Sequence, residues 1–464
     1  MQLCYSEEGY IMSEKRSSFS GKIGFVLAAA GSAVGLGNIW RFPYLAAQHG
    51  GGIFLLVYVA LAITFGVALM STEIAIGRKT GQSAIGAYTS LDKRFRFLGV
   101  LESIVPIIIL PYYSVIGGWV TKYLAVFVSG GIGDAAQDHY FDGFISQTGE
   151  PIIWFLIFVG ITALIVLFGV EKGIEKVSKF MMPVLVVLTV GIAVYSMCMP
   201  GALEGVLYYL KPDFSKFSVT TVLAAMGQLF YSMSIAMGIM ITYGSYMKKN
   251  VSISSSVKQI ALFDTGIAFF AGLMVIPAVF SFSGGNEAAL GKGPGLMFVT
   301  LPKVFASIDG VGGTIVGVLF FLLVLFAALT SSISLMETVV SVLKDKFGWS
   351  RKRTCLIVFI GCIMLGLPSS LGFGLLKDIS IGSMTILDIF DFAANSIIMP
   401  IAALITCIFV GYVLKPKALI QELEIGGKFT AKRMFTVMIK YIAPIFIVLI
   451  LASSVLEAFG IMKI

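Results

Sequence analysis

The sequence predicts an all-α protein that crosses a membrane many times, and three observations carry this prediction. Of its 464 residues, 58% are hydrophobic and only 12% are charged, whereas soluble domains carry about 25% charged residues. The mean hydropathy is +0.96. Apolar stretches of about 20 residues, the length of a spanning helix, recur along the whole chain. A secreted or singly anchored protein is therefore excluded.

Eleven apolar stretches are long enough to be spans. They are centred on residues 22–46, 51–77, 98–130, 152–170, 176–199, 218–247, 258–284, 310–343, 354–372, 385–413 and 434–459. No Gly/Ser-rich linker or hydrophilic insert interrupts them, so one membrane domain is expected. Residues 1–15 form a polar N-terminal extension, and Met12 is a plausible true start.

Basic residues gather in alternate connections between these spans. They are Arg78, Lys79, Lys93, Arg94, Arg96, Lys172, Lys176, Lys179, Lys248, Lys249, Arg351, Lys352 and Arg353. The loop between the third and fourth spans instead holds four acidic residues and no Lys or Arg. Because cytoplasmic loops are enriched in Lys and Arg, we expect the N-terminus inside and the C-terminus outside a bacterial inner membrane. The net charge of +8 then reflects membrane topology, and no nucleic-acid partner is expected.

Little in the sequence supports catalysis. The five cysteines are scattered without the paired spacing of a zinc site or disulfide framework. The sequence has only two histidines, His49 and His139, and no pattern of residues that would activate a nucleophile. It therefore offers no recognisable catalytic cluster. We expect neither an enzyme nor an organic cofactor. An ion channel stays open as an alternative, since broken helices and backbone carbonyls also build selectivity filters.

The first span is interrupted by glycines. Gly31, Gly35 and Gly37 fall within seven residues, and each costs up to about 1 kcal/mol of helix propensity, so the helix is expected to unwind there. Unwound backbone at membrane depth is tolerated only beside a cavity, where carbonyls suit sodium and amides suit a carboxylate. Glycines also allow close helix packing, but Arg41 in or beside the span favours a functional role.

The run GSAVGLGNIWRFPY, residues 31–44, resembles the first helix of the neurotransmitter:sodium symporter family. The triple glycine at 50–52, the motif EIAIGR at 73–78 and the segment QLFYSMSIAMG at 228–238 extend the resemblance. The resemblance runs from about residue 16 almost to the C-terminus. Within the family, the sequence resembles the bacterial amino-acid transporters of the eleven-helix type, similar to a tyrosine transporter.

The resemblance implies a fold of two inverted five-helix repeats, residues 16–199 and 218–413, followed by one further helix at 434–459. Helices one and six are broken in this fold, and the site lies between the breaks at mid-membrane. It implies alternating access and sodium-coupled uptake. No oligomeric state is predicted.

Two sodium sites follow from the same resemblance. The first takes the carbonyl of Ala33 with Asn38, Ser232 and Asp264. The second takes the carbonyls of Gly31, Val34 and Ala327 with the hydroxyls of Thr330 and Ser331. Sodium prefers hard oxygen ligands of these kinds.

The resemblance also implies how a zwitterionic substrate is held. The residues expected to bind it are Ser32, Ala33, Gly35, Gly37, Ile109, Tyr113, Tyr231, Ser232, Ser234, Met237, Ser331 and Leu335. Related monoamine carriers place an aspartate at the position of Gly35, whereas a glycine leaves room for the substrate's own carboxylate. We therefore expect an amino acid, hydrophobic or aromatic, with tyrosine, tryptophan and leucine foremost. A different small zwitterionic solute is the alternative.

Asp264 has a second expected role. Chloride-dependent relatives bind an anion near positions matching Tyr58, Gln228 and Ser232, and a fixed carboxylate would replace that anion. The hypothesis is that Asp264 makes transport chloride-independent and is protonated on the empty return step; the plainer alternative is a structural partner for a nearby hydroxyl.

Two gates complete the expectations from the resemblance. Arg41 pairs with Asp391 on the external side, with Tyr231 capping the substrate. On the cytoplasmic side Arg16 pairs with Asp345, supported by Tyr246. Closure of such gates commits the bound substrate.

Overall fold

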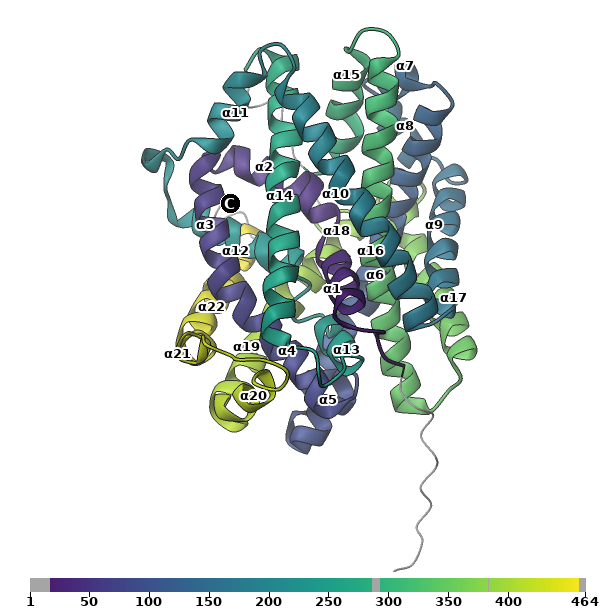
Figure 1. Ribbon diagram of the computed structural model, residues 1–464. Helices are drawn as coiled ribbons and strands as arrows, with labels where there is room; N and C mark the ends of the chain where they lie inside the picture. The colour runs from purple at the N-terminus through teal and green to yellow at the C-terminus, as the bar shows by residue number, and fades with distance from the viewer. Residues whose placement is uncertain (1–16, 286–292, 383, 459–464) are drawn as a thin grey trace, which may run out of the picture.

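The computed structural model describes residues 17–285, 293–382 and 384–458, and within these residues it contains helices and no β-strand. Figure 1 shows long helices running side by side, with shorter helices at both ends of the bundle. The predicted all-α class is confirmed.

Nine helical stretches in the described part of the chain are long and apolar enough to cross a membrane. They are Gly52–Thr80, Lys93–Val128, Glu150–Leu167, Val170–Met197, Ile253–Ser283, Gly312–Phe347, Arg351–Leu371, Ile386–Val413 and Lys432–Leu456. Each coincides with one predicted span, and only the first and sixth predicted spans lack a single long helix.

Four of the nine stretches are single α-helices, and the other five also include a π-helical or 3-10 segment, which joins two α-helices or lies at one end of the stretch. The elements of all nine stretches are α3 (Gly52–Leu61), η2 (Ala62–Gly66), α4 (Val67–Thr80), η3 (Lys93–Phe95), α6 (Arg96–Val128), α9 (Glu150–Leu167), η4 (Val170–Glu175), α10 (Lys176–Met197), α14 (Ile253–Ser283), α16 (Gly312–Phe347), α17 (Arg351–Leu371), α18 (Ile386–Asp391), η8 (Phe392–Ile398), α19 (Met399–Ile408), η9 (Phe409–Val413), α21 (Lys432–Val437), η10 (Met438–Ile442) and α22 (Ala443–Ala458).

The first and sixth predicted spans are broken, as the resemblance implies. The first consists of α1 (Lys22–Ala33), then η1 (Gly37–Arg41) and α2 (Phe42–Gln48), with a bend of 55° at the break. The sixth consists of α12 (Val219–Ser232) and α13 (Ile239–Ser245). Because neither half of the sixth is long enough to span by itself, the count of eleven spans stays a prediction.

Short helices at the two ends of the bundle were not predicted, because hydropathy finds only long apolar stretches. They are α5 (Ala84–Leu91), α7 (Ile132–Ala135), α8 (Tyr140–Ile145), α11 (Ala202–Leu210), η5 (Phe214–Lys216), η7 (Leu296–Thr300), α15 (Leu301–Ala306) and α20 (Pro416–Leu423).

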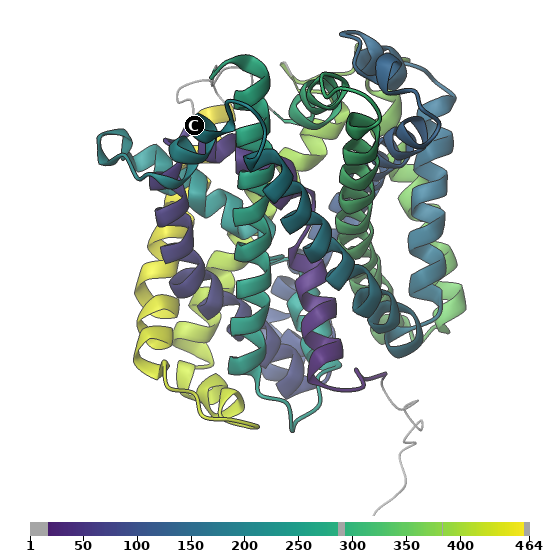
Figure 2. The ribbon, with the colours of Figure 1, turned by 45° about the horizontal axis from the view of Figure 1, so that its top comes forward.

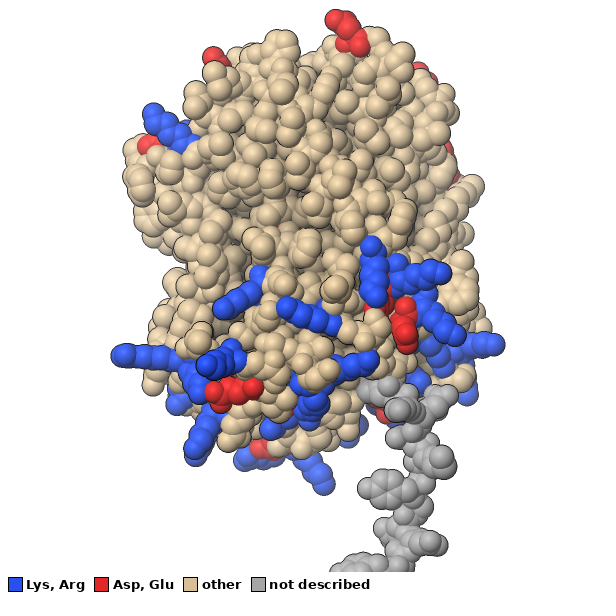
Figure 3. All heavy atoms as spheres, viewed as in Figure 1, with Lys and Arg blue, Asp and Glu red and all other residues tan. Residues whose placement is uncertain are grey.

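Charge is distributed unevenly between the two ends. Most of the Lys and Arg side chains visible in Figure 3 lie at the end of the molecule that carries α5, α13 and α20 in Figure 1. Helix α1 begins at this basic end, and α22 runs towards the opposite end (Figure 2). Away from the basic end, the face shown in Figure 3 carries few charged side chains, as expected of a lipid-facing surface.

Candidate functional site

The break in the first helix leaves backbone amides that side chains satisfy. The amide of Gly35 donates to Oδ1 of Asn38 at 3.1 Å, and the amide of Leu36 donates to the hydroxyl of Tyr113 at 3.4 Å. The carbonyl of Gly37 accepts from Nε2 of Gln228 at 2.9 Å. The predicted unwinding at the glycines is thus confirmed, with the exposed backbone facing side chains from α6 and α12.

The break in the sixth helix holds unfavourable backbone conformations. Ser234 and Ala236 have φ values of 53° and 59°, a left-handed conformation that costs about 1–3 kcal/mol for a residue with a Cβ. Two contacts hold them there: the hydroxyl of Ser234 donates to the carbonyl of Ser32 at 3.1 Å, and the amide of Ala236 donates to Oε1 of Glu73 at 2.6 Å. The two breaks therefore contact each other directly.

A cavity lies between the two breaks, and every residue predicted to bind substrate lines it. Its lining consists of Ser32, Ala33, Gly35, Leu36, Gly37, Asn38, Ile109, Tyr113, Tyr231, Ser232, Ser234, Met237, Ile239, Ser331, Ser334 and Leu335. Leu36, Ile239 and Ser334 were not predicted. Ser334 belongs to a run of hydroxyl residues, Thr330, Ser331, Ser332 and Ser334, in the predicted span at 310–343. Its hydroxyl donates to the carbonyl of Ser331 at 2.8 Å. The run was a sequence signal that could have identified it.

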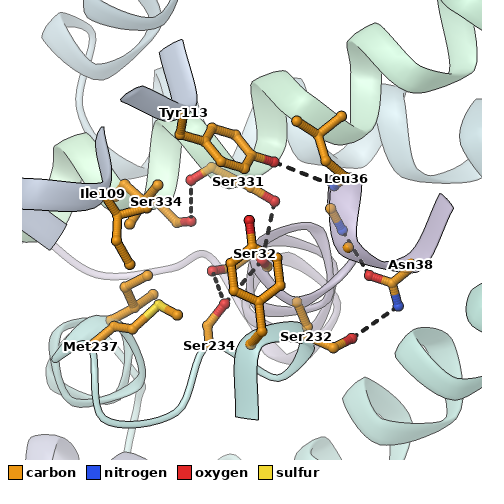
Figure 4. Close-up of a pocket in the computed structure, with 16 residues that line it drawn as sticks. Ser32, Leu36, Asn38, Ile109, Tyr113, Ser232, Ser234, Met237, Ser331 and Ser334 are labelled. Carbon is orange, nitrogen blue, oxygen red and sulfur yellow. Dashed lines mark hydrogen bonds between the residues drawn. The ribbon is translucent and has the colours of Figure 1, made fainter. Parts of the chain in front are cut away.

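The cavity has a polar and an apolar side. Figure 4 shows Ile109 and Met237 on one side, and Asn38 and Ser232 on the opposite side. The polar side includes backbone amides at the start of η1 and the buried Tyr113 hydroxyl. Such a cavity suits a small molecule that is charged at one end and apolar at the other.

The residues predicted for the first sodium site form one buried cluster around Asp264, whose side chain is 0% exposed. Asn38 donates to Oδ1 of Asp264 at 2.8 Å and to the Ser232 hydroxyl at 3.0 Å, and Ser232 also donates to Asp264. Tyr58 donates to the other carboxylate oxygen at 3.2 Å. Ala33, the last residue of α1, lines the adjoining cavity. The carboxylate and hydroxyl oxygens of this cluster fit a hard cation, whereas Asn38 turns its amide nitrogen towards Asp264 and Ser232, and its Oδ1 accepts from the Gly35 amide.

The contacts of Asp264 also bear on its predicted role in place of an anion. Tyr58 and Ser232, two of the three residues predicted to surround such an anion, do contact the carboxylate. The third, Gln228, donates to Gly37 instead. The same contacts equally suit a structural partner of two hydroxyls, so both interpretations stay open.

The residues predicted for the second sodium site meet where α1 approaches α16. The hydroxyl of Ser331 lies 3.4 Å from the carbonyl of Val34, and the hydroxyl of Thr330 lies 3.1 Å from the carbonyl of Ala327. A Cβ added to Gly31 would lie 3.1 Å from the Cβ of Thr330. All the ligands are neutral oxygens, which sodium accepts.

The predicted external gate is not formed as an ion pair. Between the described residues Arg41 and Asp391 there is no contact within salt-bridge distance; the guanidinium of Arg41 lies 5.6 Å over the ring of Tyr231. Asp391 accepts hydrogen bonds from Tyr112 at 2.8 Å and Asn395 at 2.7 Å. Neutral donors therefore satisfy the carboxylate, and the aromatic ring accommodates the cation.

The predicted internal gate is described only in part. Arg16 lies outside the described residues, so its pairing with Asp345 stays a prediction. Asp345 accepts from the amide of Ser83 at 2.9 Å. The hydroxyl of Tyr246 donates at 2.8 Å to Glu337, a partner that sequence reasoning did not identify because this carboxylate lies within an apolar helix.

Comparisons with known proteins find relatives that match nearly the whole chain. The family model described as the sodium:neurotransmitter symporter family matches residues 16–133 and 136–461. An uncharacterized sodium-dependent transporter of Bacillus subtilis (strain 168) is 34% identical over 452 residues, which cover 96% of this chain and 99% of the relative. An uncharacterized sodium-dependent transporter of Methanocaldococcus jannaschii is 36% identical over 85% of this chain and 81% of the relative. The crystal structure of MhsT in complex with L-phenylalanine is similar with a TM-score of 0.85 and 37% identity, covering 95% of this chain and 100% of that chain.

Proposed function

The chain belongs to the sodium:neurotransmitter symporter family and is a sodium-dependent symporter, and from this premise we propose that it carries a hydrophobic or aromatic amino acid into the cell. Tyrosine, tryptophan and leucine are the foremost candidates. The observation that carries the proposal is the cavity between the two helix breaks, because it is polar on one side and apolar on the other.

The substrate carboxylate binds the amides near Gly35 and Gly37 and the hydroxyl of Tyr113. At Gly35 a Cβ would lie 2.7 Å from the Ser331 hydroxyl and 3.2 Å from the Tyr113 hydroxyl. A side chain at this position would therefore fill the space that the carboxylate needs. The ammonium binds carbonyls of the broken helices and the hydroxyl of Ser234.

The apolar side chain of the substrate lies against Ile109, Tyr231, Met237 and Leu335. Met is flexible and polarisable, so it adapts to apolar groups of different shape. MhsT, whose structure is similar to this one, was crystallised with L-phenylalanine, and the apolar side of the present cavity is consistent with a ligand of that kind.

Two sodium ions accompany the substrate in this proposal. One binds beside Asp264 and the other between α1 and α16. The second ion joins two helices, so its occupancy biases their separation and thereby alternating access. Asp264 takes the place of chloride, which makes transport chloride-independent.

The topology follows the charge distribution. The end rich in Lys and Arg faces the cytoplasm of a bacterial cell, with α1 starting there and α22 ending outside. The two inverted repeats are residues 16–199 and 218–413. Arg41 and Asp391 close the external vestibule by moving into contact once the substrate is bound.

A competition experiment tests the substrate class. Purified protein in proteoliposomes takes up radiolabelled tryptophan, while each of the twenty amino acids is added in excess, with sodium and chloride varied separately. Hydrophobic and aromatic amino acids should compete, sodium should be required and chloride should not. Competition by charged or very small amino acids alone would contradict the proposed pocket.

A further inference from the structure

A lysine stands inside the last predicted span. Lys440 is the only charged residue between Met434 and Leu456. The helical stretch begins at Lys432, so Lys440 lies about 12 Å further along the helix, at 1.5 Å per residue. A lysine that only needed contact with water could stand in the first turn, as Lys432 does. Because a charged side chain within a span is costly and usually functional, Lys440 requires an explanation.

Lys440 contacts the end of the neighbouring span. Its ammonium nitrogen lies 5.5 Å from the centre of the Tyr412 ring, and the Tyr412 hydroxyl donates to the backbone carbonyl of Lys440 at 2.8 Å. Tyr412 belongs to η9 and Lys440 to η10, so two π-helical segments contact each other here. Such segments are rare and frequent at functional sites. Together they hold the ammonium group beside the ring.

This contact lies on the outside of the helix bundle. The side chains of Tyr412 and Tyr441 are 53% and 56% exposed, and those of Val413 and Val437 are also exposed. Exposed apolar side chains on a spanning helix face lipid, and tyrosines gather where the hydrocarbon meets the headgroups. Lys440 is half-buried among them. Its ammonium group is therefore placed on a lipid-facing surface near the level of the headgroups.

The chain supplies no negative charge for this lysine. Residues 414–440 include two acidic side chains, Glu422 and Glu424, and both have other partners. Glu422 pairs with Arg78 and Lys249. Glu424 pairs with Lys432. The other basic residues of this segment form no ion pair with any residue that the structure describes; they are Lys415, Lys417, Lys428, Arg433 and Lys440.

The chain places two of these bases near Lys440. Arg433 precedes it by about two helical turns, which puts the two side chains on a similar face about 10 Å apart. Lys415 follows Tyr412 so closely that their Cα atoms are at most about 10 Å apart. Lys415 has a φ of 67°, a conformation that favours glycine, yet a charged and exposed side chain stands there. We call Tyr412, Lys415, Arg433 and Lys440 the headgroup patch.

We propose that the headgroup patch binds an anionic phospholipid, with the lipid phosphate against the ammonium group of Lys440 and the acyl chains along the exposed side chains of Val437 and Tyr441. The patch stands at the basic end of the molecule, where α20 and α21 lie (Figures 1 and 3). Basic segments at a membrane surface attract anionic lipids. The bound lipid joins the ends of the tenth and eleventh predicted spans.

The inference goes beyond the proposed function and does not depend on the substrate. Native mass spectrometry tests it on the purified, delipidated protein in detergent, titrated with phosphatidylglycerol or with phosphatidylcholine of the same acyl chains. Wild type should bind one phosphatidylglycerol molecule more tightly than phosphatidylcholine by about tenfold or more, the effect of one charged contact. Lys440→Gln should lose this preference, and Lys440→Arg should keep it because the positive charge remains.

Lys346→Gln is the matched control. Lys346 on α16 is also exposed and also lies over an aromatic ring, that of Phe347 at 5.0 Å, but it is not part of the headgroup patch. Its replacement removes the same charge and should leave the preference for phosphatidylglycerol unchanged. A Lys440→Gln protein with the wild-type preference, or an equal loss in Lys346→Gln, would overturn the inference.

Two further measurements cover the remaining outcomes. Inorganic phosphate in large excess should not displace the lipid, because it lacks acyl chains; displacement would identify a site for a free anion and contradict the lipid. If Lys440→Gln does not fold, the thermal midpoint of wild type decides: phosphatidylglycerol should raise it more than phosphatidylcholine does, and equal midpoints would refute the patch. Absence of amino-acid uptake would refute the proposed function and leave these lipid measurements valid.

Discussion

Gly35→Ala probes the cavity with the smallest possible change. The added methyl group would lie 2.7 Å from the Ser331 hydroxyl and 3.2 Å from the Tyr113 hydroxyl, whereas unstrained carbon contacts begin near about 3.5 Å. The backbone at Gly35 does not have a positive φ, so alanine brings no conformational penalty of its own. The effect is therefore confined to space inside the cavity.

The expected loss has two parts. Forcing a methyl group into a filled site costs about 1–3 kcal/mol. Displacing the carboxylate from its donors loses at least one charged hydrogen bond, worth about 1.5–3 kcal/mol. Together they amount to about 2.5–6 kcal/mol, which weakens substrate binding by about 10² to 10⁴.

Equilibrium binding of tryptophan at saturating sodium measures this loss. Gly160→Ala is the matched control, because a Cβ at Gly160 in α9 meets no atom within 4 Å; it should bind like wild type. Thermal unfolding of both variants shows whether the fold is intact. A folded Gly35→Ala protein whose affinity lies within about threefold of wild type would refute the placement of the carboxylate.

Three further predictions concern other parts of the molecule. Asp264→Ser should create a chloride requirement for uptake; equal uptake by the variant with and without chloride would contradict the anion-replacement role. Thr330→Val should raise the sodium concentration needed for half-maximal binding by about tenfold or more, and an unchanged sodium titration would remove Thr330 from the second site. Arg78→Ala should lower the free energy of unfolding by about 3–5 kcal/mol, because Arg78 forms a buried ion pair with Glu422 at 2.7 Å; a thermal midpoint equal to wild type would contradict this. Burial acts to raise the pKa of Glu422, but the hydrogen bonds of Lys249 and Arg78 outweigh it and hold that pKa below its usual value. The ionised pair therefore stabilises the protein above about pH 4.3 and loses this contribution as the pH falls further, which acid unfolding of wild type against Glu422→Gln would measure.

The long helices and the cavity lining could be predicted because both leave local signals. Nine predicted spans coincide with helical stretches since hydropathy is a property of neighbouring residues. Most cavity residues lie at or beside the two helix breaks, and each break has a recognisable run of glycine or small polar residues. The others come from α6 and α16. The expected fold then places the two runs opposite each other.

Contacts between distant parts of the chain could not be predicted in the same way. Thr406 is separated by 304 positions from Glu102, whose carboxylate it contacts, and neither residue stands in a recognisable motif. The partners that Arg41 and Asp391 have in this structure were not predictable for a related reason: opposite charges on facing helices suggest only an ion pair, whereas Tyr231 lies under the guanidinium, and Tyr112 and Asn395 donate to the carboxylate. Their pairing as an external gate stays a prediction. The short helix α20 is too brief and too polar for a hydropathy search.

The most direct test of the central claim is sodium-driven accumulation in proteoliposomes. With an inward sodium gradient, tryptophan should accumulate above its external concentration, and the accumulated tryptophan should leak out when the gradient is dissipated. Gly35→Ala should show neither behaviour. Tryptophan that equilibrates across the membrane regardless of sodium, or a sodium current that needs no amino acid, would contradict a coupled symporter.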